Sequence, residues 1–257
     1  MSITDGLRGG SAPAAMAPRI VRVASVSLTA AALPWSYPET EQARIDAHWA
    51  HSIKANPKYF NGTVYTLTDL VHDTSAVRAT LAPIEFRQFL YWRDQGKPAG
   101  GIRDAFGAAI VRSREGHVML VRAAQGMLCA GRLTFVSGFI DLNDRTGDGM
   151  LDLAACTGRE LGEEAGLGPD CVAAEPGYIV AEAEAMVLFG VVYRSSLAAV
   201  ALRARMLDFV RSSPAPEIDD VVIAVAADTA LMRDLQPTTA LALGLVLGVP
   251  GGAGPTG

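Results

Sequence analysis

The sequence predicts an α/β protein, in which a mixed β-sheet is flanked by helices. The main observation is an amphipathic helix near residues 153–165 with predicted strands before and after it, an order typical of such a sheet. Those strands are expected at 106–112, 117–122 and 133–140 before the helix, and at 186–193 and 221–225 after it. The composition agrees, because 257 residues with 50% hydrophobic and 19% charged side chains can bury a substantial core.

The chain is expected to divide into an α+β extension at residues 20–99 and a main domain at 100–248. Residues 1–19 and 249–257 are rich in small residues and proline, and we expect both tails to be disordered. The extension should contain a strand within 20–33, a helix over 38–55, a strand over 63–68 and a helix over 83–93. Two more helices are expected at 196–210 and 238–247. Segment 20–33 is too short and polar to span a bilayer, which favours a cytoplasmic protein.

Charge and cysteine usage exclude several function classes. The net charge of −5 argues against a nucleic-acid backbone as partner, which would require a basic face. Cys129, Cys156 and Cys171 are odd in number and lack C-x-x-C spacing, so they indicate neither a disulfide framework nor a zinc site. His48 and His51 lie three residues apart on a predicted helix, but without an acidic or cysteine partner they are interpreted as surface or packing residues.

The central helix concentrates negative charge near its C-terminal end. In the run R-E-L-G-E-E-A-G-L, the carboxylates of Glu160, Glu163 and Glu164 lie within one turn of one another, and only Arg159 is nearby. Like charges at this spacing repel, so a hard divalent cation such as Mg²⁺ would supply the missing counter-charge. From the spacing alone, a solvated acidic helix end is an equally good interpretation.

The same run resembles the second half of the Nudix box, G-x5-E-x7-R-E-U-x-E-E-x-G-U with U apolar. Every fixed position from Arg159 to Leu167 matches, whereas residues 135–141 read F-V-S-G-F-I-D, with Val136 and Ser137 in place of the usual Pro and Gly. Gly138 corresponds to the first glycine of the box. The resemblance implies the Nudix α/β/α sandwich over residues 100–248 and hydrolysis of a pyrophosphate linkage in a nucleoside diphosphate derivative, with Mg²⁺, or Mn²⁺, as cofactor.

The spacing of the box requires an insertion. Counting forward from Gly138 places the first glutamate of the pattern at Asp144, whereas counting back from Arg159 places it at Leu151. A seven-residue insertion at 145–151, R-T-G-D-G-M-L, reconciles the two counts as a loop extension. The first glutamate is therefore absent, or replaced by Asp144 or Asp152, and we expect metal binding to survive because the other three carboxylates are retained.

Two further stretches are similar to one Nudix branch. Residues 56–62, N-P-K-Y-F-N-G, and 86–90, F-R-Q-F-L, resemble the leader of enzymes that hydrolyse UDP-glucose or GDP-mannose, which also carry a long loop inside the box. The alternative for 56–62 is a simple helix stop and turn. A nucleotide sugar is therefore the expected substrate. ADP-ribose, a dinucleotide, coenzyme A, or a nucleotide-binding module without turnover are the alternatives.

The resemblance assigns catalytic roles to four residues of the helix. Glu160, Glu163 and Glu164 would be metal ligands, with Glu163 serving as a second ligand or a base, and Arg159 would orient a glutamate. Gly138 would let the backbone approach the phosphates. Phe139 and Arg122 are candidate substrate-binding residues, with a surface arginine the equal alternative for Arg122.

Other features of the site stay open in the sequence. Candidate general bases are the acidic residues near two later strands, with solvated loop acids as the default interpretation: Glu182, Glu184, Glu217, Asp219 and Asp220. The aromatic residues that could stack on a base or belong to the core are Tyr59, Phe60, Phe139 and Tyr178. We expect a small-molecule nucleotide as partner, no nucleic acid or membrane, and an extension that contributes to substrate choice or to a homodimer.

Overall fold

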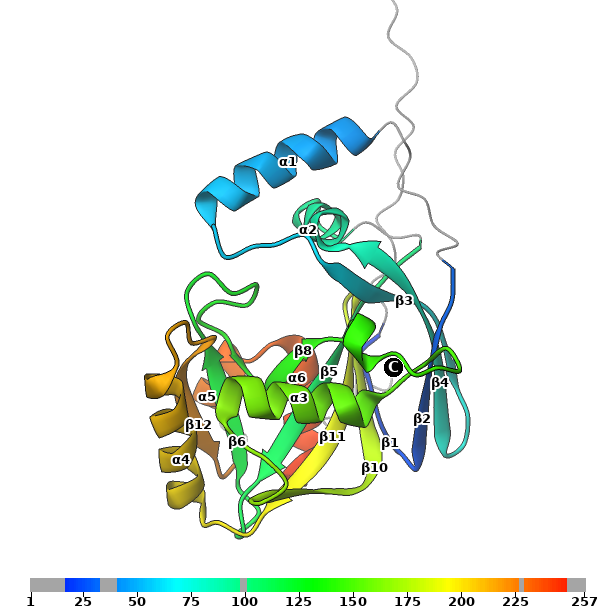
Figure 1. Ribbon diagram of the computed structural model, residues 1–257. Helices are drawn as coiled ribbons and strands as arrows, with labels where there is room; N and C mark the ends of the chain where they lie inside the picture. The colour runs from blue at the N-terminus through cyan, green and yellow to red at the C-terminus, as the bar shows by residue number, and fades with distance from the viewer. Residues whose placement is uncertain (1–16, 33–40, 98–100, 227–228, 249–257) are drawn as a thin grey trace, which may run out of the picture.

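The computed structural model describes residues 17–32, 41–97, 101–226 and 229–248. These residues form two β-sheets with helices packed against them (Figure 1). The α/β class predicted from the sequence is confirmed. The disorder expected for residues 1–16 and 249–257, and the predicted helix start at 38–40, lie outside the described residues.

The larger sheet is mixed and forms the centre of the protein. Its strands are β1 (Arg19–Val23), β5 (Asp104–Arg112), β6 (Val118–Ala123), β10 (Val172–Ala183), β11 (Met186–Ser195) and β12 (Ile218–Ala224), in the order β1-β10-β11-β5-β6-β12. Two short strands join it: β7 (Leu133–Thr134) pairs with β6, and β8 (Val136–Phe139) pairs with β5. The β11–β5 pair is parallel and the other pairs are antiparallel, so the sheet is mixed as predicted.

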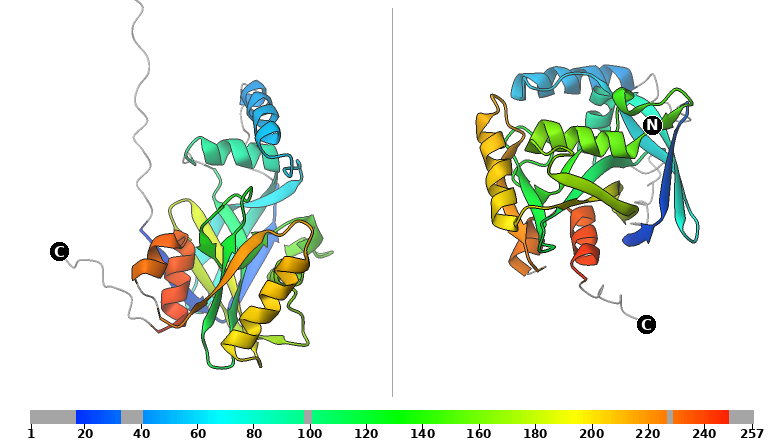
Figure 2. Two further views of the ribbon diagram at one scale, coloured as in Figure 1. Left: turned by 90° about the vertical axis from the view of Figure 1, so that its left-hand side faces the viewer. Right: turned by 60° about the horizontal axis from the view of Figure 1, so that its bottom comes forward.

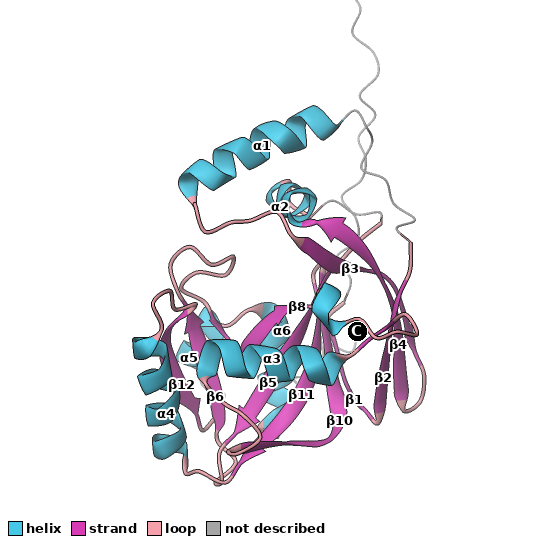
Figure 3. Ribbon diagram, in the orientation of Figure 1, coloured by secondary structure: helices cyan, strands magenta, loops and turns pink. Residues whose placement is uncertain are grey.

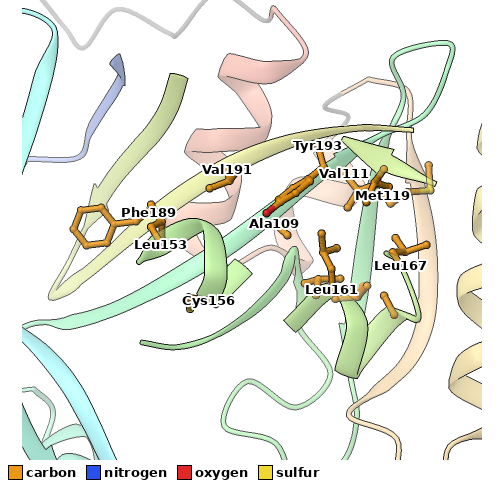
Figure 4. Close-up of a cluster of buried hydrophobic side chains, with 14 of the residues drawn as sticks. Ala109, Val111, Met119, Leu153, Cys156, Leu161, Leu167, Phe189, Val191 and Tyr193 are labelled. Carbon is orange, nitrogen blue, oxygen red and sulfur yellow. The ribbon is translucent and has the colours of Figure 1, made fainter. Parts of the chain in front are cut away.

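Helices cover both faces of this sheet. On one face lie α3 (Leu153–Ala165) and α4 (Ala199–Ser212), and on the other lie α5 (Thr229–Asp234) and α6 (Pro237–Val246) (Figure 2). Figure 4 shows the first layer, in which Leu153, Cys156 and Leu161 of α3 pack over side chains of the sheet. A separate buried cluster joins α6 to the opposite face, so the two faces together form an α/β/α sandwich.

A second, smaller sheet stands beside the first. It contains β3 (Thr63–His72), β4 (Ala76–Glu85), β2 (Ser25–Ala30) and β9 (Met150–Leu151), in the order β3-β4-β2-β9. Above it lie α2 (Phe86–Asp94) and α1 (Gln42–Ala55), with α1 packed on α2 (Figure 3). Phe86, Phe89 and Trp92 of α2 form a third buried cluster with Val64 of β3 and Ile84 of β4.

The order of strands along the sequence does not follow the division into two sheets. Strand β1 lies in the extension but forms an edge of the larger sheet, whereas β9 lies in the box insertion but pairs with β2 of the smaller sheet. The single strand expected within 20–33 is therefore two strands, which separate at Ala24 and enter different sheets. Likewise, the expected loop at 145–151 ends in a strand, because Leu151 pairs with Leu28.

Other boundaries differ in ways that local signals explain. The helix expected over 83–93 begins at Phe86, because residues up to Glu85 complete β4 and Glu85 then caps the helix with Gln88. Strand β4 itself was not predicted between the expected strand and helix. Strand β10 begins at Val172, well before the short segment 181–185 that was expected.

Candidate functional site

Helix α3 carries the acidic residues and is fixed firmly at both ends. The Asp152 side chain accepts hydrogen bonds from the backbone N–H groups of Ala154 and Ala155, at 2.9 and 3.0 Å, and so caps the N-terminus. Gly166, with φ of 63°, ends the helix in the left-handed conformation that glycine favours. The buried residues of the helix include Leu161, Ala165 and Glu160, whereas Glu163 is exposed and Glu164 is half-buried.

Gly138 on β8 makes room for a carboxylate. A Cβ atom at this position would lie only 2.0 Å from Oε1 of Glu160 and 2.2 Å from its carboxyl carbon. The glycine was expected to let phosphate approach the backbone. In the structure, the space that a side chain would need at residue 138 is occupied by the Glu160 carboxylate.

Arg159 gathers the carboxylates around it. Its Nη1 atom lies 2.7 Å from Glu160 and 3.4 Å from Glu163, and Nη2 lies 3.3 Å from Asp144 and 3.6 Å from Asp141. Burial by itself lowers the pKa of Arg159, but the charges of Glu160, Asp144 and Asp141 outweigh it and raise the pKa above its ordinary value. The guanidinium is thus a fixed positive centre, consistent with an orienting role.

The structure separates Asp144 from Asp152, the two candidates for the missing first glutamate. Asp144 is buried, accepts a hydrogen bond from the backbone N–H of Asp141 at 2.9 Å and contacts Arg159. Asp152 is exposed and is engaged in capping α3. Asp144 therefore occupies the position beside the arginine, and Asp152 has a structural role at the helix N-terminus.

A cavity of about 810 Å³ lies beside α3 and β8. Its wall includes Glu160 and Glu164 from α3, Gly138 and Phe139 from β8, and Glu217 from the segment before β12. Glu160 is buried and Glu164 is half-buried, whereas Glu217 is more accessible. Three carboxylates thus face one cavity, which lies between the larger sheet and the turn at residues 58–62.

Nearby positive charges compensate these carboxylates only in part. Burial raises the pKa of Glu160 to about 7, against the opposing effect of Arg159. Burial, Glu160 and Glu217 together raise the pKa of Glu164 well above its ordinary value. Partial burial also raises the pKa of Glu217, although Lys58 opposes this shift. A cation that entered the cavity would favour the ionised form of these groups and lower their pKa values.

Glu217 was among the acids interpreted by default as solvated, and its position in the cavity could not be read from the sequence. Glu217 follows a Pro-rich segment that has no helical or strand periodicity, so the sequence does not indicate its neighbours. The pairing of β12 with β6 brings it to the cavity beside α3. Conversely, Glu163 is not part of the cavity wall. Its side chain is 63% exposed and lies beside Arg159.

Arg122 does not reach the cavity. Its Nη1 atom donates a hydrogen bond to the carbonyl of Gly131 at 2.7 Å, and the guanidinium pairs with Asp234 at 3.3 Å. The side chain therefore ties the loop after β6 to α5. Glu182 also lies elsewhere, in a buried contact with His72 and Arg103.

The four candidate aromatic residues separate into core and cavity positions. Tyr59 packs edge-on against Phe86, and Phe139 packs edge-on against Phe86 and Phe89, although Tyr59 and Phe139 also contribute to the cavity wall. Tyr178 is partly buried against the main core. Phe60 is different, because its side chain is 78% exposed and lines the cavity. Among these four residues, Phe60 is exposed and the other three are partly buried.

The donor set is suited to a hard divalent cation. Within the described ranges, no group of three or more His, Cys, Asp or Glu side chains has already converged to ligand geometry. The chemistry nevertheless fits, because carboxylate oxygens are the ligands that Mg²⁺ and Mn²⁺ prefer. Burial is the largest cause of the raised pKa values of Glu160 and Glu164, and neighbouring carboxylates add to it. A bound cation would favour the ionised form of both groups. Among the helices that the structure describes, none has the length and apolar character to cross a membrane.

Comparisons with known proteins find relatives only among solved structures. No protein-family model and no curated protein matches the chain. A Nudix hydrolase from M. smegmatis matches with 14% identity and a TM-score of 0.37, over 58% of this chain and 88% of that one. A MutT protein from Methanosarcina mazei Go1 matches with 13% identity and a TM-score of 0.37, over 56% and 91%.

A third solved structure is a two-activity protein. This NMN adenylyltransferase/ADP-ribose pyrophosphatase from Francisella tularensis matches with 14% identity and a TM-score of 0.38, over 62% of this chain. The matched region covers 45% of the length of that protein. At such identities the activity of this chain has to be argued from its own site.

Proposed function

We propose that the chain is a divalent-metal-dependent hydrolase that cleaves the pyrophosphate linkage of a nucleoside diphosphate derivative, with a nucleotide sugar as substrate. The observation that carries the proposal is the set of three carboxylates, Glu160, Glu164 and Glu217, on one wall of a cavity of about 810 Å³. A cavity of this size falls within the range of small-molecule sites, about 300–1,000 Å³.

The acidic residues of the cavity support a requirement for a metal. Three carboxylates facing a diphosphate would repel it, so the substrate needs a cation between itself and this wall. A bound Mg²⁺ or Mn²⁺ would neutralise the phosphate oxygens and lower the pKa of a water molecule that attacks phosphorus. Glu160 and Glu164 would hold the cation once their carboxylates converge. Glu163 would join them only if its side chain turned away from the surface.

The remaining residues would position these groups and move a proton. Arg159 fixes the Glu160 carboxylate at 2.7 Å, and Asp144 fixes Arg159 from the other side at 3.3 Å. Glu217 stands on a different element from the proposed ligands, and its raised pKa suits a general base that accepts the proton of the attacking water. Arg122 would act through the loop that it holds, without touching phosphate.

The preference for a nucleotide sugar draws on the turn at residues 56–62. Lys58, Tyr59 and Phe60 of this turn line the cavity, and the Asn56 side chain anchors the turn by donating a hydrogen bond to the carbonyl of Gly126 at 2.6 Å. The extension thus contributes directly to the site. The exposed ring of Phe60 would provide a stacking surface for the nucleobase, an interaction that tolerates any base.

The proposal is tested by a substrate panel. The purified protein is incubated with UDP-, GDP- and ADP-sugars, ADP-ribose, a dinucleotide and coenzyme A, with Mg²⁺ or with EDTA, and the products are identified by chromatography. We expect release of a nucleoside monophosphate from a nucleotide sugar with Mg²⁺ alone. The surface variant Glu175→Gln should behave as wild type. Binding without metal-dependent product across the panel would instead identify a nucleotide-binding module without turnover.

A further inference from the structure

Two further acidic residues, Asp104 and Asp141, line the same cavity as the three glutamates, and Asp141 contacts Arg159. Asp104 is the first residue of β5 and lines the cavity together with Arg93 and Lys97. Arg93 lies in the last turn of α2, and Lys97 follows that helix. The backbone N–H of Asp104 donates to the carbonyl of Ala185 at 2.9 Å, which fixes the main chain at this point. The proposed hydrolysis does not use this residue.

The Asp104 carboxylate has no partner of its own. In the part of the chain that the structure describes, its oxygens form neither a hydrogen bond nor an ion pair. The nearby Arg93 is engaged elsewhere, because its Nη2 atom lies 2.9 Å from Asp94 and its Nη1 atom donates to the carbonyl of Leu128 at 3.4 Å. Asp104 is half-buried and lines the cavity, so its carboxylate is open to hydrogen bonds from a bound ligand.

The protonation state of Asp104 defines what such a ligand can be. Burial raises its pKa to about 6, and the charges of Lys97 and Arg93 oppose that rise. At neutral pH the group is therefore mostly ionised and can only accept hydrogen bonds. It can therefore bind a neutral group with several O–H or N–H donors. Sugar hydroxyls meet this requirement, and two adjacent hydroxyls match the two oxygens of one carboxylate.

We propose that Asp104 is a specificity-determining residue, whose carboxylate accepts hydrogen bonds from hydroxyl groups of the sugar attached to the diphosphate. The inference rests on the proposed function and assigns the sugar to the Asp104 end of the cavity. The diphosphate then lies toward Glu160 and Glu164, and the nucleobase toward Phe60. Each part of the substrate would thus meet side chains of matching chemistry.

The test compares wild type with Asp104→Asn, which keeps the size of the side chain and removes its charge. Steady-state hydrolysis is measured with UDP-glucose and GDP-mannose, and with analogues that lack one sugar hydroxyl at a time. For the better intact substrate we expect Asp104→Asn to lower kcat/KM about tenfold to a hundredfold, mainly through KM, as for loss of a hydrogen bond to a charged group. For one or two deoxy analogues, wild type and variant should become nearly equal.

Asp94→Asn is the matched control, because it removes an equal charge next to the same Arg93 but does not line the cavity. We expect it to change kcat/KM less than about threefold, as for an exposed ion pair. Calorimetric binding of non-hydrolysable analogues of UDP-glucose and GDP-mannose with Mg²⁺ provides a second readout, in which Asp104→Asn should weaken affinity by a similar factor. Thermal unfolding of each variant verifies that the fold is kept.

The outcomes separate the two proposals. If wild type hydrolyses neither nucleotide sugar, the proposed substrate class is wrong and the role of Asp104 falls with it. If wild type is active and Asp104→Asn is equally active, only the role of Asp104 is overturned. An equal loss on every deoxy analogue would identify a structural residue. A loss that depends on the nucleobase and not on the sugar would mean that Asp104 contacts a base, which also overturns the proposal.

Discussion

The absence of a Cβ atom at Gly138 allows the Glu160 carboxylate, a proposed metal ligand, to occupy its position. Because Glu160 fills the space beside this glycine, Gly138→Ala should push the carboxylate away from its place between Arg159 and the cavity. We expect kcat to fall about 100-fold, as for a displacement of about 1 Å at a reacting centre. The free energy of unfolding should change by only about 1 kcal/mol, since the end of a flexible side chain can move.

The control for this substitution is Gly147→Ala in the box insertion. A Cβ atom there would meet no heavy atom within 4 Å, and the backbone is not left-handed. Activity and thermal stability of Gly147→Ala should match wild type. If Gly138→Ala also kept full activity, the Glu160 carboxylate would not need its present position.

Glu164 should oppose stability in the absence of metal. Because its folded-state pKa lies well above the ordinary 4.5, the native state binds more protons than the unfolded state, and the free energy of unfolding falls as pH rises from 4.5 through the folded-state pKa. Glu164→Gln removes this penalty. In EDTA, the variant should be more stable than wild type near about pH 8, and the difference should disappear near about pH 4. Denaturant unfolding at several pH values measures this.

The same variant should lose activity by about 100-fold or more with Mg²⁺, because a proposed ligand is gone. A Glu164→Gln protein that was both less stable at high pH and fully active would contradict the electrostatic picture of the cavity. Added Mg²⁺ should raise the midpoint of thermal unfolding of wild type, and should do so less for the variant.

At the level of the helix, Asp144 and Asp152 should differ in what they control. Asp152→Ala removes the N-cap of α3, so the free energy of unfolding should fall by about 0.5–2 kcal/mol while kcat/KM stays within about threefold. Asp144→Ala removes a contact of Arg159, so kcat should fall about 10- to 100-fold. Parallel denaturation and kinetics distinguish the two, and a reversed pattern would return the role of the missing glutamate to Asp152.

The sequence predicts elements well where one segment carries its own signal. Helix α3 has a capping residue, an apolar stripe and a terminal glycine, and it lies where the periodicity indicates. Strand β4 has no such advantage. Its run from Ala76 to Glu85 contains a proline at position 83, and its parallel pairing with β2 joins residues distant in sequence, such as Ser25 and Ala76.

The same distinction holds in the site. The charge pattern of α3 points to Glu160 and Glu164 without any tertiary information. The cavity position of Glu217 depends on the register of β12 against β6, and that of Asp104 depends on how β5 meets the cavity in the folded chain. Glu163 is predicted as a ligand from the same helical spacing, yet its side chain is exposed. Helical spacing gives the direction in which a side chain leaves the helix but not which residues pack against it.

On the scale of the whole molecule, Glu182 joins the two sheets. Its oxygens on β10 lie 2.7 Å from His72 of β3 and 2.8 Å from Arg103, which follows the extension. Glu182→Gln should lower the free energy of unfolding by about 1–3 kcal/mol, because charge-assisted hydrogen bonds at a buried site are weakened. Denaturant unfolding measures the loss, with Glu175→Gln as control. A large loss of kcat in a fully stable variant would instead favour the base role considered from the sequence.

The pairing of β1 with β10 has a consequence for synthesis of the protein. Arg19 pairs with Glu182 and Val23 with Tyr178, so an edge of the larger sheet is closed by residues from opposite parts of the chain. Such contacts between distant residues form slowly. On the ribosome, the segment that becomes β1 has to wait until β10 has left the exit tunnel. During that time the early strands are exposed to chaperones and to other nascent chains.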